Sequence, residues 1–522
     1  MSFTRSVPSG VFGFSGDFNG PDVPGSPGGP DGLGSGVLGD LVRVVSAAGY
    51  GVWRGEVERI GGCSHPRRFR GSTRWTDASG RVVREFSSGG LPGGVLLAPC
   101  QNRRASRCPS CARVYRGDVY HLVRAGLTGG KGVPDTVSGH ARVFVTLTAP
   151  SFGPVHAVRV SGGRAVACRP RRVQERCPHG RSLGCWHVHG PDDPRVGAPL
   201  CADCYDYAGA VLWNAHLGWL WHRFTTYLPR ALARATGRTH SALRAMVRLS
   251  YVKVVEWQAR GSLHVHAVIR ADRAPDPDAP GGGPGPAPGW VTPEVLDRAV
   301  RDAVGAVGVV VDAGPHGTRV LRWGRQVDVT TIPPAEDTGN GQGERAARYI
   351  AKYATKDITD HITDPGHVGG TRTARGAHLA RMAAMARDLS DVPGLTRIGR
   401  HARTLGYPGH VTSKSRTYST TLTALRQARS RHHTGPDQDP GVRRSSAWRL
   451  VGHGWTPGQA LIAADVARDA AVNRAAARDA WGGAGTAPPG GGVGQRAVGR
   501  QRYVSGVRSA PSECSFRSGV GR

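Results

Sequence analysis

The sequence predicts an α+β fold in which helices flank an antiparallel sheet, with cysteine-rich zinc-binding insertions and disordered termini. Two apolar, β-branched segments, 249–258 and 263–269, are joined by a short glycine-containing connection that is typical of a hairpin. A third such segment, 142–149, ends at a proline and predicts a buried strand. Residues 208–235 carry apolar side chains at helical spacing, which predicts a helix that faces the core.

Shifts in composition divide the chain of 522 residues into four segments. Residues 1–37 are rich in Gly, Pro and Ser and are expected to be disordered. Residues 38–135 contain several cysteines and are expected to form an N-terminal module with a zinc site. The main domain is expected over 136–430, and residues 431–522 are expected to be a basic C-terminal tail.

Further elements are expected inside these segments. A cysteine-rich insertion of zinc-binding type covers 165–207, and a Gly/Pro linker covers 271–289. The tail is expected to hold one Ala-rich helix at about 456–480, because Thr456 and Pro457 suit the N-cap and first position of a helix. The other elements expected are a helix after Pro109, a helix over about 292–307, a strand near 325–332 and a helix over about 344–355.

The charge of the chain points to a nucleic-acid partner. A formal net charge of +31 repels itself unless a polyanion lies nearby. An anionic membrane is the alternative, but no run of about 18 apolar residues could span a bilayer. The first residues lack the apolar region of a secretory signal. We therefore expect a cytoplasmic protein that does not bind membranes.

The segment 263–269 contains two histidines that can share a metal ion. Side chains alternate faces along a strand, so His264 and His266 point the same way. Glu256, on the partner strand of the hairpin, can supply an oxygen ligand. Two nitrogens and one carboxylate suit a catalytic Mg²⁺ or Mn²⁺. The alternative, a chance surface pair, fits poorly with the apolar residues around both histidines.

The segment 348–356 predicts a helix with two tyrosines on one face. Tyr349 and Tyr353 are four residues apart, and Lys352 and Lys356 lie beside them. A tyrosine hydroxyl becomes a useful nucleophile only where its phenolate is stabilised, which nearby ammonium groups can do. The alternative is that the two rings pack in the core and the lysines are solvated.

Taken together, these segments resemble the HUH endonuclease superfamily. Phe144-Val-Thr-Leu-Thr-Ala resembles its first motif, His264-Val-His266 its histidine motif, and Tyr349-Ile-Ala-Lys-Tyr353 its two-tyrosine motif. A closer resemblance, over roughly 40–480, is to replication initiator proteins of actinobacterial rolling-circle plasmids. The segments that carry it are Cys100-Gln-Asn-Arg-Arg, Cys108-Pro-Ser-Cys111, Pro199-Leu-Cys-Ala-Asp-Cys204-Tyr-Asp-Tyr, Glu256-Trp-Gln-Ala-Arg-Gly and Gly409-His-Val-Thr-Ser-Lys414-Ser-Arg-Thr-Tyr-Ser-Thr.

The resemblance implies a palm-type (RRM-like) sheet and a DNA-nicking reaction. His264, His266 and Glu256 would hold the metal, and Tyr353 or Tyr349 would attack a phosphate of plasmid origin DNA in single-stranded or extruded hairpin form. The products would be a 5′-phosphotyrosine and a free 3′-OH primer. Tyr353 is the favoured first nucleophile, and Lys352 would position the phosphate.

Unwinding and synthesis would need a host helicase and polymerase, because the chain has no P-loop motif. Two alternatives stay open at this point. One is a non-catalytic, zinc-containing DNA-binding regulator. The other is an HUH transposase or relaxase.

The cysteines predict two structural zinc sites, because a chain in the cytosol seldom uses disulfides. Cys108 and Cys111 form the first pair, which Cys100 and Cys63 (or His65) would complete. Residues of the second site would be Cys201, Cys204, Cys177 and Cys185, with His179, His187 and His189 as competing ligands. Cys168 and Cys514 have no evident partners and are expected to play no part.

Basic residues near these motifs are candidate phosphate contacts, which set affinity without reading sequence. Some lie beside the cysteine and tyrosine segments, and others follow Gly409. The candidate DNA-binding residues are Arg103, Arg104, Arg348, Lys356, Lys414 and Arg416.

Overall fold

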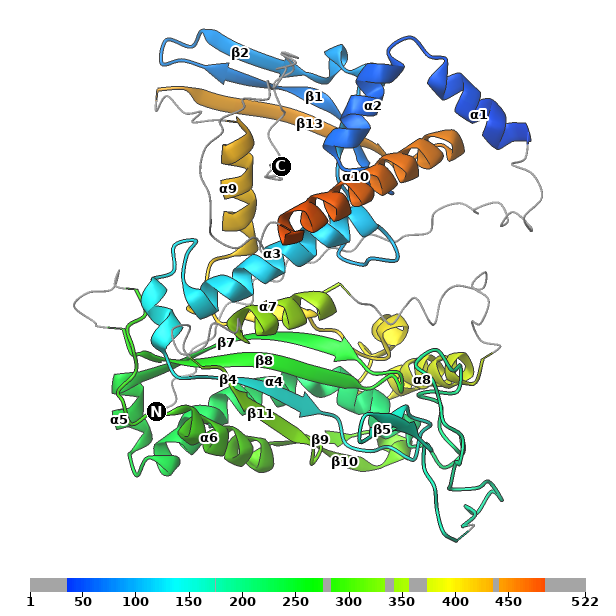
Figure 1. Cartoon of the computed structure of the whole chain (residues 1–522), viewed down its shortest axis with the longest axis vertical. Helices are drawn as coiled ribbons and strands as arrows, with labels where there is room; N and C mark the ends of the chain where they lie inside the picture. Colours follow the sequence, from blue (N-terminus) through cyan, green and yellow to red (C-terminus); the bar gives the residue numbers. More distant parts are fainter. Residues whose placement is uncertain are drawn as a thin grey trace.

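The computed structural model describes residues 35–173, 175–275, 283–333, 342–355, 373–434 and 441–483 (Figure 1). Helices pack on antiparallel sheets in this part of the chain, so the expected mixed helix-and-sheet class is confirmed. The finer assignment to a palm-type fold stays a prediction.

A five-stranded sheet lies at the centre of the larger body, in the order β11-β4-β8-β7-β12 with every neighbouring pair antiparallel. The expected hairpin is confirmed: β7 and β8 pair along their whole length, and the turn 258–262 joins them. The strands are β4 (Arg142–Thr148), β7 (Val247–Trp257), β8 (Leu263–Arg273), β11 (Val327–Thr331) and β12 (Thr412–Lys414).

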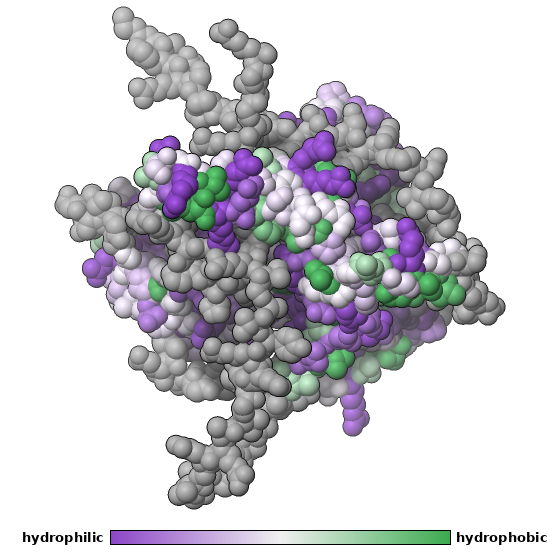
Figure 2. Space-filling model, turned by 90° about the horizontal axis from the view of Figure 1, so that it is seen from above, coloured by the Kyte–Doolittle hydropathy of each residue, from purple (hydrophilic) through white to green (hydrophobic). Residues whose placement is uncertain are grey.

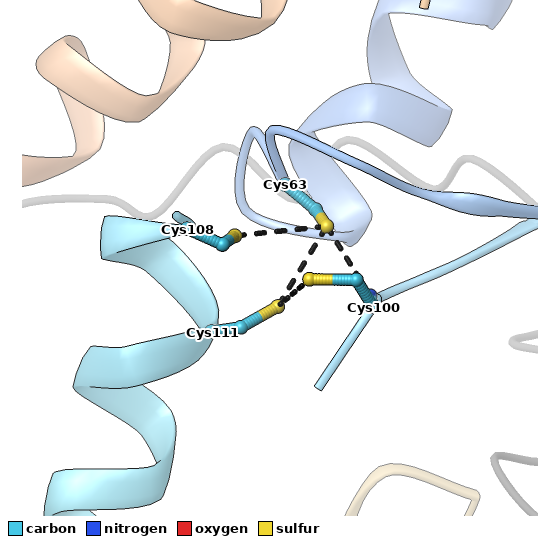
Figure 3. A group of neighbouring side chains, drawn as sticks. All are labelled: Cys63, Cys100, Cys108 and Cys111. Carbon is cyan, nitrogen blue, oxygen red and sulfur yellow. Dashed lines mark hydrogen bonds between the residues drawn. The ribbon is translucent and has the colours of Figure 1, made fainter. Parts of the chain in front are cut away.

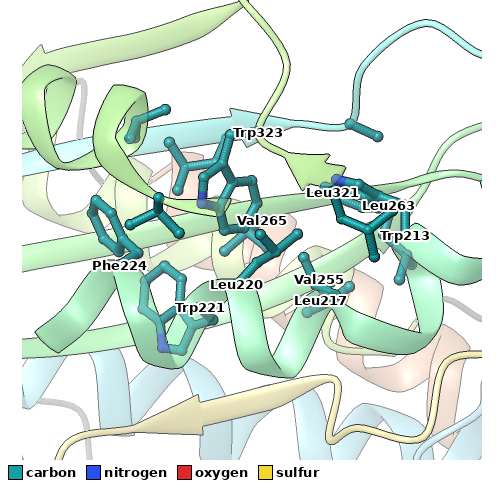
Figure 4. Packing of buried hydrophobic residues seen from close by; sticks show 14 of the residues in the cluster. Trp213, Leu217, Leu220, Trp221, Phe224, Val255, Leu263, Val265, Leu321 and Trp323 are labelled. Atoms are coloured by element: carbon teal, nitrogen blue, oxygen red, sulfur yellow. The ribbon is translucent and has the colours of Figure 1, made fainter. Parts of the chain in front are cut away.

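One face of this sheet is an apolar core covered by helices. The long helix α4 (Tyr207–Ala235) packs against α6 (Pro293–Ala306) and α8 (Ala374–Asp388). Its aromatic and leucine side chains meet Val255, Leu263 and other inward residues of β7 and β8, including Val265 (Figure 4). All side chains of this set are largely removed from water, so this face provides most of the hydrophobic stabilisation of the domain.

The opposite face of the same sheet carries a smaller apolar cluster and three other helices. These are α3 (Pro109–Thr128), α7 (Gln342–Tyr353) and α9 (Leu422–Thr434). Val254 and Val268 of the sheet pack with Ala347 and Ile350 of α7. The cluster fixes α7 across β7 and β8, with α3 beside it (Figure 1).

A second sheet joins the two ends of the described chain. β13 (Arg443–His453) pairs with β1 (Arg67–Thr76), which also pairs with β2 (Val82–Ser87) and β3 (Leu96–Ala98). Three helices pack beside it: α1 (Ser35–Val45), α2 (Tyr50–Arg59) and α10 (Pro457–Gly483). This sheet and these helices form the upper part of the molecule in Figure 1.

The C-terminal region differs from the basic tail expected over 431–522. Residues 443–483 form β13 and α10, which complete the N-terminal module. The Ala-rich helix is present and runs over Pro457–Gly483 rather than about 456–480. The strand β13 could not be foreseen from the sequence. It pairs with β1, which lies near the other end of the chain, and its own sequence is rich in Arg and Ser rather than in apolar residues.

The remaining elements are short. The hairpin of β5 (Arg159–Ser161) and β6 (Arg164–Val166) begins before the expected insertion 165–207 and overlaps only its first residues. β9 (Gly308–Asp312) and β10 (Thr318–Arg322) form another hairpin, and α5 (His240–Met246) leads into β7.

The expected N-terminal segment and the expected linker fall partly outside the described residues. Residues 1–34 of the N-terminal segment are not described, but 35–37 begin α1. In the expected linker 271–289, residues 271–273 end β8, and 276–282 are not described. Among the helices in the described ranges, none has both the length and the apolar character to cross a membrane.

Candidate active site

The two histidines of β8 lie on the α7 side of the sheet, on the same face, as the strand alternation predicts. His264 stands opposite Glu256 of β7 and Thr148 of β4. His266 stands opposite Val254 and Thr146. Because β8 is the central strand, both imidazoles are supported by strands on each side.

His266 is held by two polar neighbours. Its Nε2 lies 3.0 Å from Oε2 of Glu256, and its Nδ1 lies 3.0 Å from Oγ1 of Thr146. Only 3% of the residue is exposed, so these contacts fix the plane of a buried ring. The sequence pattern indicated Glu256 but not Thr146, although the alternation of β4 places Thr146 on the site face.

His264 supplies a second nitrogen to this face. Its Nε2 is buried without a hydrogen-bond partner among the described residues. Burial lowers its pKa to about 4, and the neighbouring His266 acts in the same direction. The imidazole is therefore neutral at physiological pH, the form in which a histidine binds a metal.

These three side chains carry donor atoms of the kinds that a divalent cation binds. An orphaned imidazole nitrogen, a second imidazole and a carboxylate lie on adjacent strands, which is a donor set suited to Mg²⁺ or Mn²⁺. The residues expected as metal ligands are thus brought together on one face, although they form a looser group than the cysteine clusters below.

The tyrosine helix α7 lies directly over His266. The ring centroid of His266 is 5.0 Å from that of Tyr349 and 5.5 Å from that of Tyr353. The two tyrosine rings are 4.7 Å apart. Phe144 of β4 completes the aromatic group, 6.0 Å from His266 and 5.6 Å from Tyr349. The alternative that both tyrosines serve only as core packing does not fit Tyr349, which is 39% exposed.

The two tyrosines differ in environment. Partial loss of solvation raises the pKa of Tyr349, and its hydrogen bond with Tyr353 raises it further. Lys352 is exposed, and its Nζ lies 5.6 Å from the ring centroid of Tyr353. The ammonium group is thus placed beside Tyr353 rather than beside Tyr349.

The C-terminal end of α7 is tied to the cysteine module through α3. Nη2 of Arg116 donates to Oγ1 of Thr355 over 3.0 Å, and the backbone N–H of Ala105 donates to the carbonyl of Thr355 over 3.4 Å. Ala105 lies in the loop between two cysteines of the first cluster. Hydrogen bonds therefore join the segment around this cluster to the end of the tyrosine helix.

The first cysteine cluster consists of Cys63, Cys100, Cys108 and Cys111, as the sequence predicts, without His65 (Figure 3). The Sγ atom of Cys63 lies 3.8 Å from that of Cys108 and 3.7 Å from that of Cys111. Backbone N–H groups of Cys100, Ser64 and Asn102 donate to sulfurs of the cluster. All four thiols are free of disulfides and can hold one zinc ion.

The second cluster differs in one member from the group expected. Cys177, Cys201 and Cys204 are joined by His179, one of the competing ligands, and not by Cys185. The expectation was wrong for Cys185 because the local C-x-x-C pair fixes only two ligands, and loop folding determines the others.

A third cluster was not foreseen from the sequence. It contains His156, Cys168, Cys185 and His189, all with ligand atoms within 4.8 Å of one another. Cys168, expected to play no part, is one of its members. His156 and Cys168 belong to no short motif, so no local pattern indicates this group.

The candidate DNA-binding residues fall in different settings. Arg348 and Arg416 are exposed, and Arg103 and Arg104 are half-buried in the loop before α3. Lys414 is different: its Nζ donates to carbonyl oxygens of Ser415, Arg416 and Ser419, and burial lowers its pKa. Lys356 lies outside the described residues.

Viewed from the side of the second sheet, the described surface is mostly hydrophilic, with small separate apolar patches (Figure 2). The exposed arginines of β13 include Arg443, Arg444 and Arg449. Leu450 and Val451 of the same strand are also exposed, so this part of the molecule presents both charged and apolar side chains.

Comparisons with known proteins point to one family. The family model described as "Replication initiator protein, pSAM2" matches residues 49–468. A curated "Replication initiator protein" from Streptomyces ambofaciens is 40% identical over 462 residues, which cover 85% of this chain and 95% of that protein. No solved structure matches the chain significantly.

Proposed function

Because the chain belongs to the pSAM2-type family of replication initiator proteins for plasmid replication, we propose that it starts replication as an HUH-type nickase. In this proposal it cuts one strand of plasmid origin DNA with a tyrosine of α7. The observation that carries the proposal is the position of both tyrosine rings, 5.0 and 5.5 Å from the His266 ring. A DNA-binding regulator would not need a nucleophile beside a candidate metal site.

The reaction is a transesterification at one phosphate. The tyrosine hydroxyl loses its proton, and its oxygen forms a bond to phosphorus. The bond from phosphorus to the 3′ oxygen of the preceding nucleotide breaks, and that oxygen takes up a proton. The DNA 5′ end is then linked to the protein as a phosphotyrosine, and the free 3′-OH can prime synthesis.

His264, His266 and Glu256 would hold the divalent cation. When bound, Mg²⁺ or Mn²⁺ supplies Lewis-acid polarisation of a phosphate oxygen. The chain itself contributes the fixed orientation of these ligands. Thr146 and Glu256 hold the ring of His266, and burial keeps His264 unprotonated.

Tyr353 is the better candidate for the first attack. The raised pKa of Tyr349 makes its phenolate harder to form. Lys352 lies beside Tyr353, where its positive charge can stabilise a phenolate or the phosphate. Tyr349 is then available for the second strand transfer that closes the circle after one round.

The origin substrate would be single-stranded DNA or an extruded hairpin, held partly by phosphate contacts. Arg348 lies on the tyrosine helix and Arg416 lies on the exposed segment after β12, so both can serve this purpose. A host helicase and polymerase would supply unwinding and synthesis.

The test is the formation of a covalent protein–DNA adduct. Purified protein is incubated with Mn²⁺ and a labelled single strand carrying the plasmid origin, then denatured and separated by electrophoresis. We expect a labelled adduct with wild type, and a loss on the order of 10³-fold or more with Tyr353→Phe, since the nucleophile itself is removed. Tyr349→Phe should retain the first cleavage.

Tyr227→Phe is the matched control, because Tyr227 lies on α4 on the other side of the sheet. It should leave the adduct unchanged. Undiminished adduct with both Tyr349 and Tyr353 replaced would rule out the tyrosine mechanism. Origin binding without any adduct would favour the non-catalytic regulator, and cleavage at a transposon end instead of an origin would favour a transposase.

A further inference from the structure

The third Cys/His cluster is formed by Cys168, Cys185 and His189 of the insertion 165–207 and by His156, which precedes the insertion in the sequence. His189 and Cys185 are buried, with 1% and 6% of their surface exposed. Nε2 of His189 lies 3.2 Å from Nδ1 of His156 and 3.4 Å from Sγ of Cys185. Two nitrogens and two sulfurs therefore converge on one buried point.

The tautomer of His189 is set by a carboxylate. Its Nδ1 lies 2.7 Å from Oδ2 of Asp193, so Nδ1 carries the proton and donates it to this acceptor. Nε2 then has a bare lone pair that faces the nitrogen of His156. The two nitrogens are 3.2 Å apart, so either a proton on Nδ1 of His156 or a bound cation must lie between them.

Asp193 is itself held in place. Nη2 of Arg195 donates to Oδ2 of Asp193 over 2.8 Å, and the backbone N–H of Arg195 donates to Oδ1 over 2.9 Å. A histidine whose second nitrogen donates to a fixed carboxylate is the usual outer arrangement of zinc-binding histidines. The cluster therefore has an ordered second layer of contacts as well as four ligands.

The two cysteines are also arranged as ligands. The backbone N–H of Ala157 donates to Sγ of Cys168 over 3.2 Å, a contact that stabilises a thiolate. Cys185 exchanges two backbone hydrogen bonds with Arg169, the residue after Cys168, over 2.8 and 2.9 Å. This pairing holds the two cysteine segments side by side, and the Sγ atoms of both cysteines lie within 4.8 Å of the two histidine ligand atoms.

We propose that His156, Cys168, Cys185 and His189 bind a structural zinc ion that fastens the insertion to the turn between Glu256 and His264. Two nitrogens and two sulfurs with a closed coordination sphere are typical of structural zinc. The insertion is poor in apolar residues, so a metal can replace the missing core.

The connection to the turn runs through Gly197. His156 and Gly197 are joined by a backbone hydrogen bond of 2.8 Å. Gly197 has a φ of +94°, and a Cβ there would lie 2.3 Å from the carbonyl oxygen of Ala259. The insertion therefore touches the turn backbone directly. Ala259 lies in the turn between β7, which carries Glu256, and β8, which carries His264. A cluster that is held rigid by zinc would therefore also restrict the motion of this turn.

Zinc content tests the metal site without reference to DNA cleavage. The full-length protein is purified without a metal-affinity tag, and zinc per chain is measured by plasma mass spectrometry. We expect Cys185→Ser and His189→Ala each to lose one zinc equivalent relative to wild type. His187→Ala is the matched control, because His187 is exposed two residues away and should retain all zinc. Unchanged zinc in soluble Cys185→Ser and His189→Ala protein would overturn the proposal.

Asp193→Asn keeps all four ligands and serves if the ligand variants do not fold. It should weaken one zinc site by about 10- to 100-fold, measured as earlier release of one equivalent to a competing chelator. Release identical to wild type would contradict the proposal.

Amide hydrogen exchange tests the link to the turn. In Asp193→Asn treated with chelator, residues 256–264 should exchange faster than in the wild type treated in the same way. The same treatment of His187→Ala should give wild-type exchange. Faster exchange limited to the insertion itself would refute the fastening role while leaving the zinc site intact.

Discussion

The two faces of the central sheet use the same strands for different purposes. On the α4 side, Val265 and Ile269 are buried in a continuous apolar core. On the α7 side, His264 and His266 alternate with them and meet Glu256 and the tyrosine helix. Because side chains alternate between the two faces of a strand, β8 contributes apolar residues to the core on one face and histidines to the candidate active site on the other.

This difference shows why the site face can contain buried polar groups. Burying an imidazole next to a carboxylate costs free energy unless both find partners. The apolar face, with α4 against β7 and β8, supplies the compensating hydrophobic burial. On the site face, the smaller apolar cluster around Ile350 holds α7 against the sheet.

The largest difference is expected between substitutions of two neighbouring residues of β8, one of which should impair DNA cleavage and the other the stability of the fold. His266→Gln should lower covalent adduct formation by about 100-fold or more, because a metal ligand and the contact to Glu256 are removed. Its unfolding free energy should change little. Val265→Ala should show the reverse, with a loss of about 2 kcal/mol in stability from buried methyl groups and the resulting cavity.

Adduct yield and urea unfolding of both variants, at a temperature where both remain folded, measure this contrast. If Val265→Ala lowered cleavage as much as His266→Gln while staying folded, the two faces would not be functionally distinct.

A smaller effect is expected from pH. The folded-state pKa of His264 is about 4, below the unfolded value of about 6.5. The unfolded chain therefore binds more protons between these values, and the contribution of His264 to stability is present above pH 6.5 and lost as pH falls toward 4. His378, whose pKa burial also lowers to about 4, acts in the same window.

His264→Gln should accordingly reduce the loss of stability between pH 7 and pH 5. The measurement is the urea midpoint of wild type, His264→Gln and His378→Gln at each pH. A wild-type and a His264→Gln protein with the same pH dependence would show that His264 is not held neutral by burial.

The smallest effect is expected on DNA affinity, from substitutions of the candidate DNA-binding residues Arg416 and Lys414. Arg416→Ala should weaken binding to a single-stranded origin a few-fold and reduce the slope of log affinity against log salt by about 0.7, the value for one phosphate contact. Lys414→Met should leave that slope unchanged, because the Lys414 ammonium already donates to three backbone carbonyls. Filter binding over a range of salt concentrations distinguishes the two, and equal slopes for both variants would contradict this assignment.

Local patterns in the sequence were sufficient for four strands of the central sheet, β4, β7, β8 and β11, and for placing His264 and His266 on one face. The alternation of β8, the four-residue spacing of Tyr349 and Tyr353 and the apolar spacing of α4 are each set within a few residues. Such patterns depend on strand and helix geometry alone, so they could be read without knowledge of the rest of the chain.

Two of the unpredicted features depend on contacts between distant segments. The pairing of β13 with β1 joins two ends of the chain, and neither strand has a strong apolar alternation. Cys168 joins His156 and His189 only because irregular loops fold back on each other. Thr146 was missed for another reason, since a hydroxyl next to an imidazole becomes significant only when the strand register is known.

The most direct test of the account is to locate the covalent bond to DNA. Trypsin cuts after Arg348, Lys352 and Lys356, so Tyr349 and Tyr353 fall in separate peptides, 349–352 and 353–356. After reaction with origin single strand and Mn²⁺ and nuclease trimming, mass spectrometry should find the 5′-nucleotide on peptide 353–356. A nucleotide attached outside α7 would contradict the claim that this helix and the two histidines form one active site.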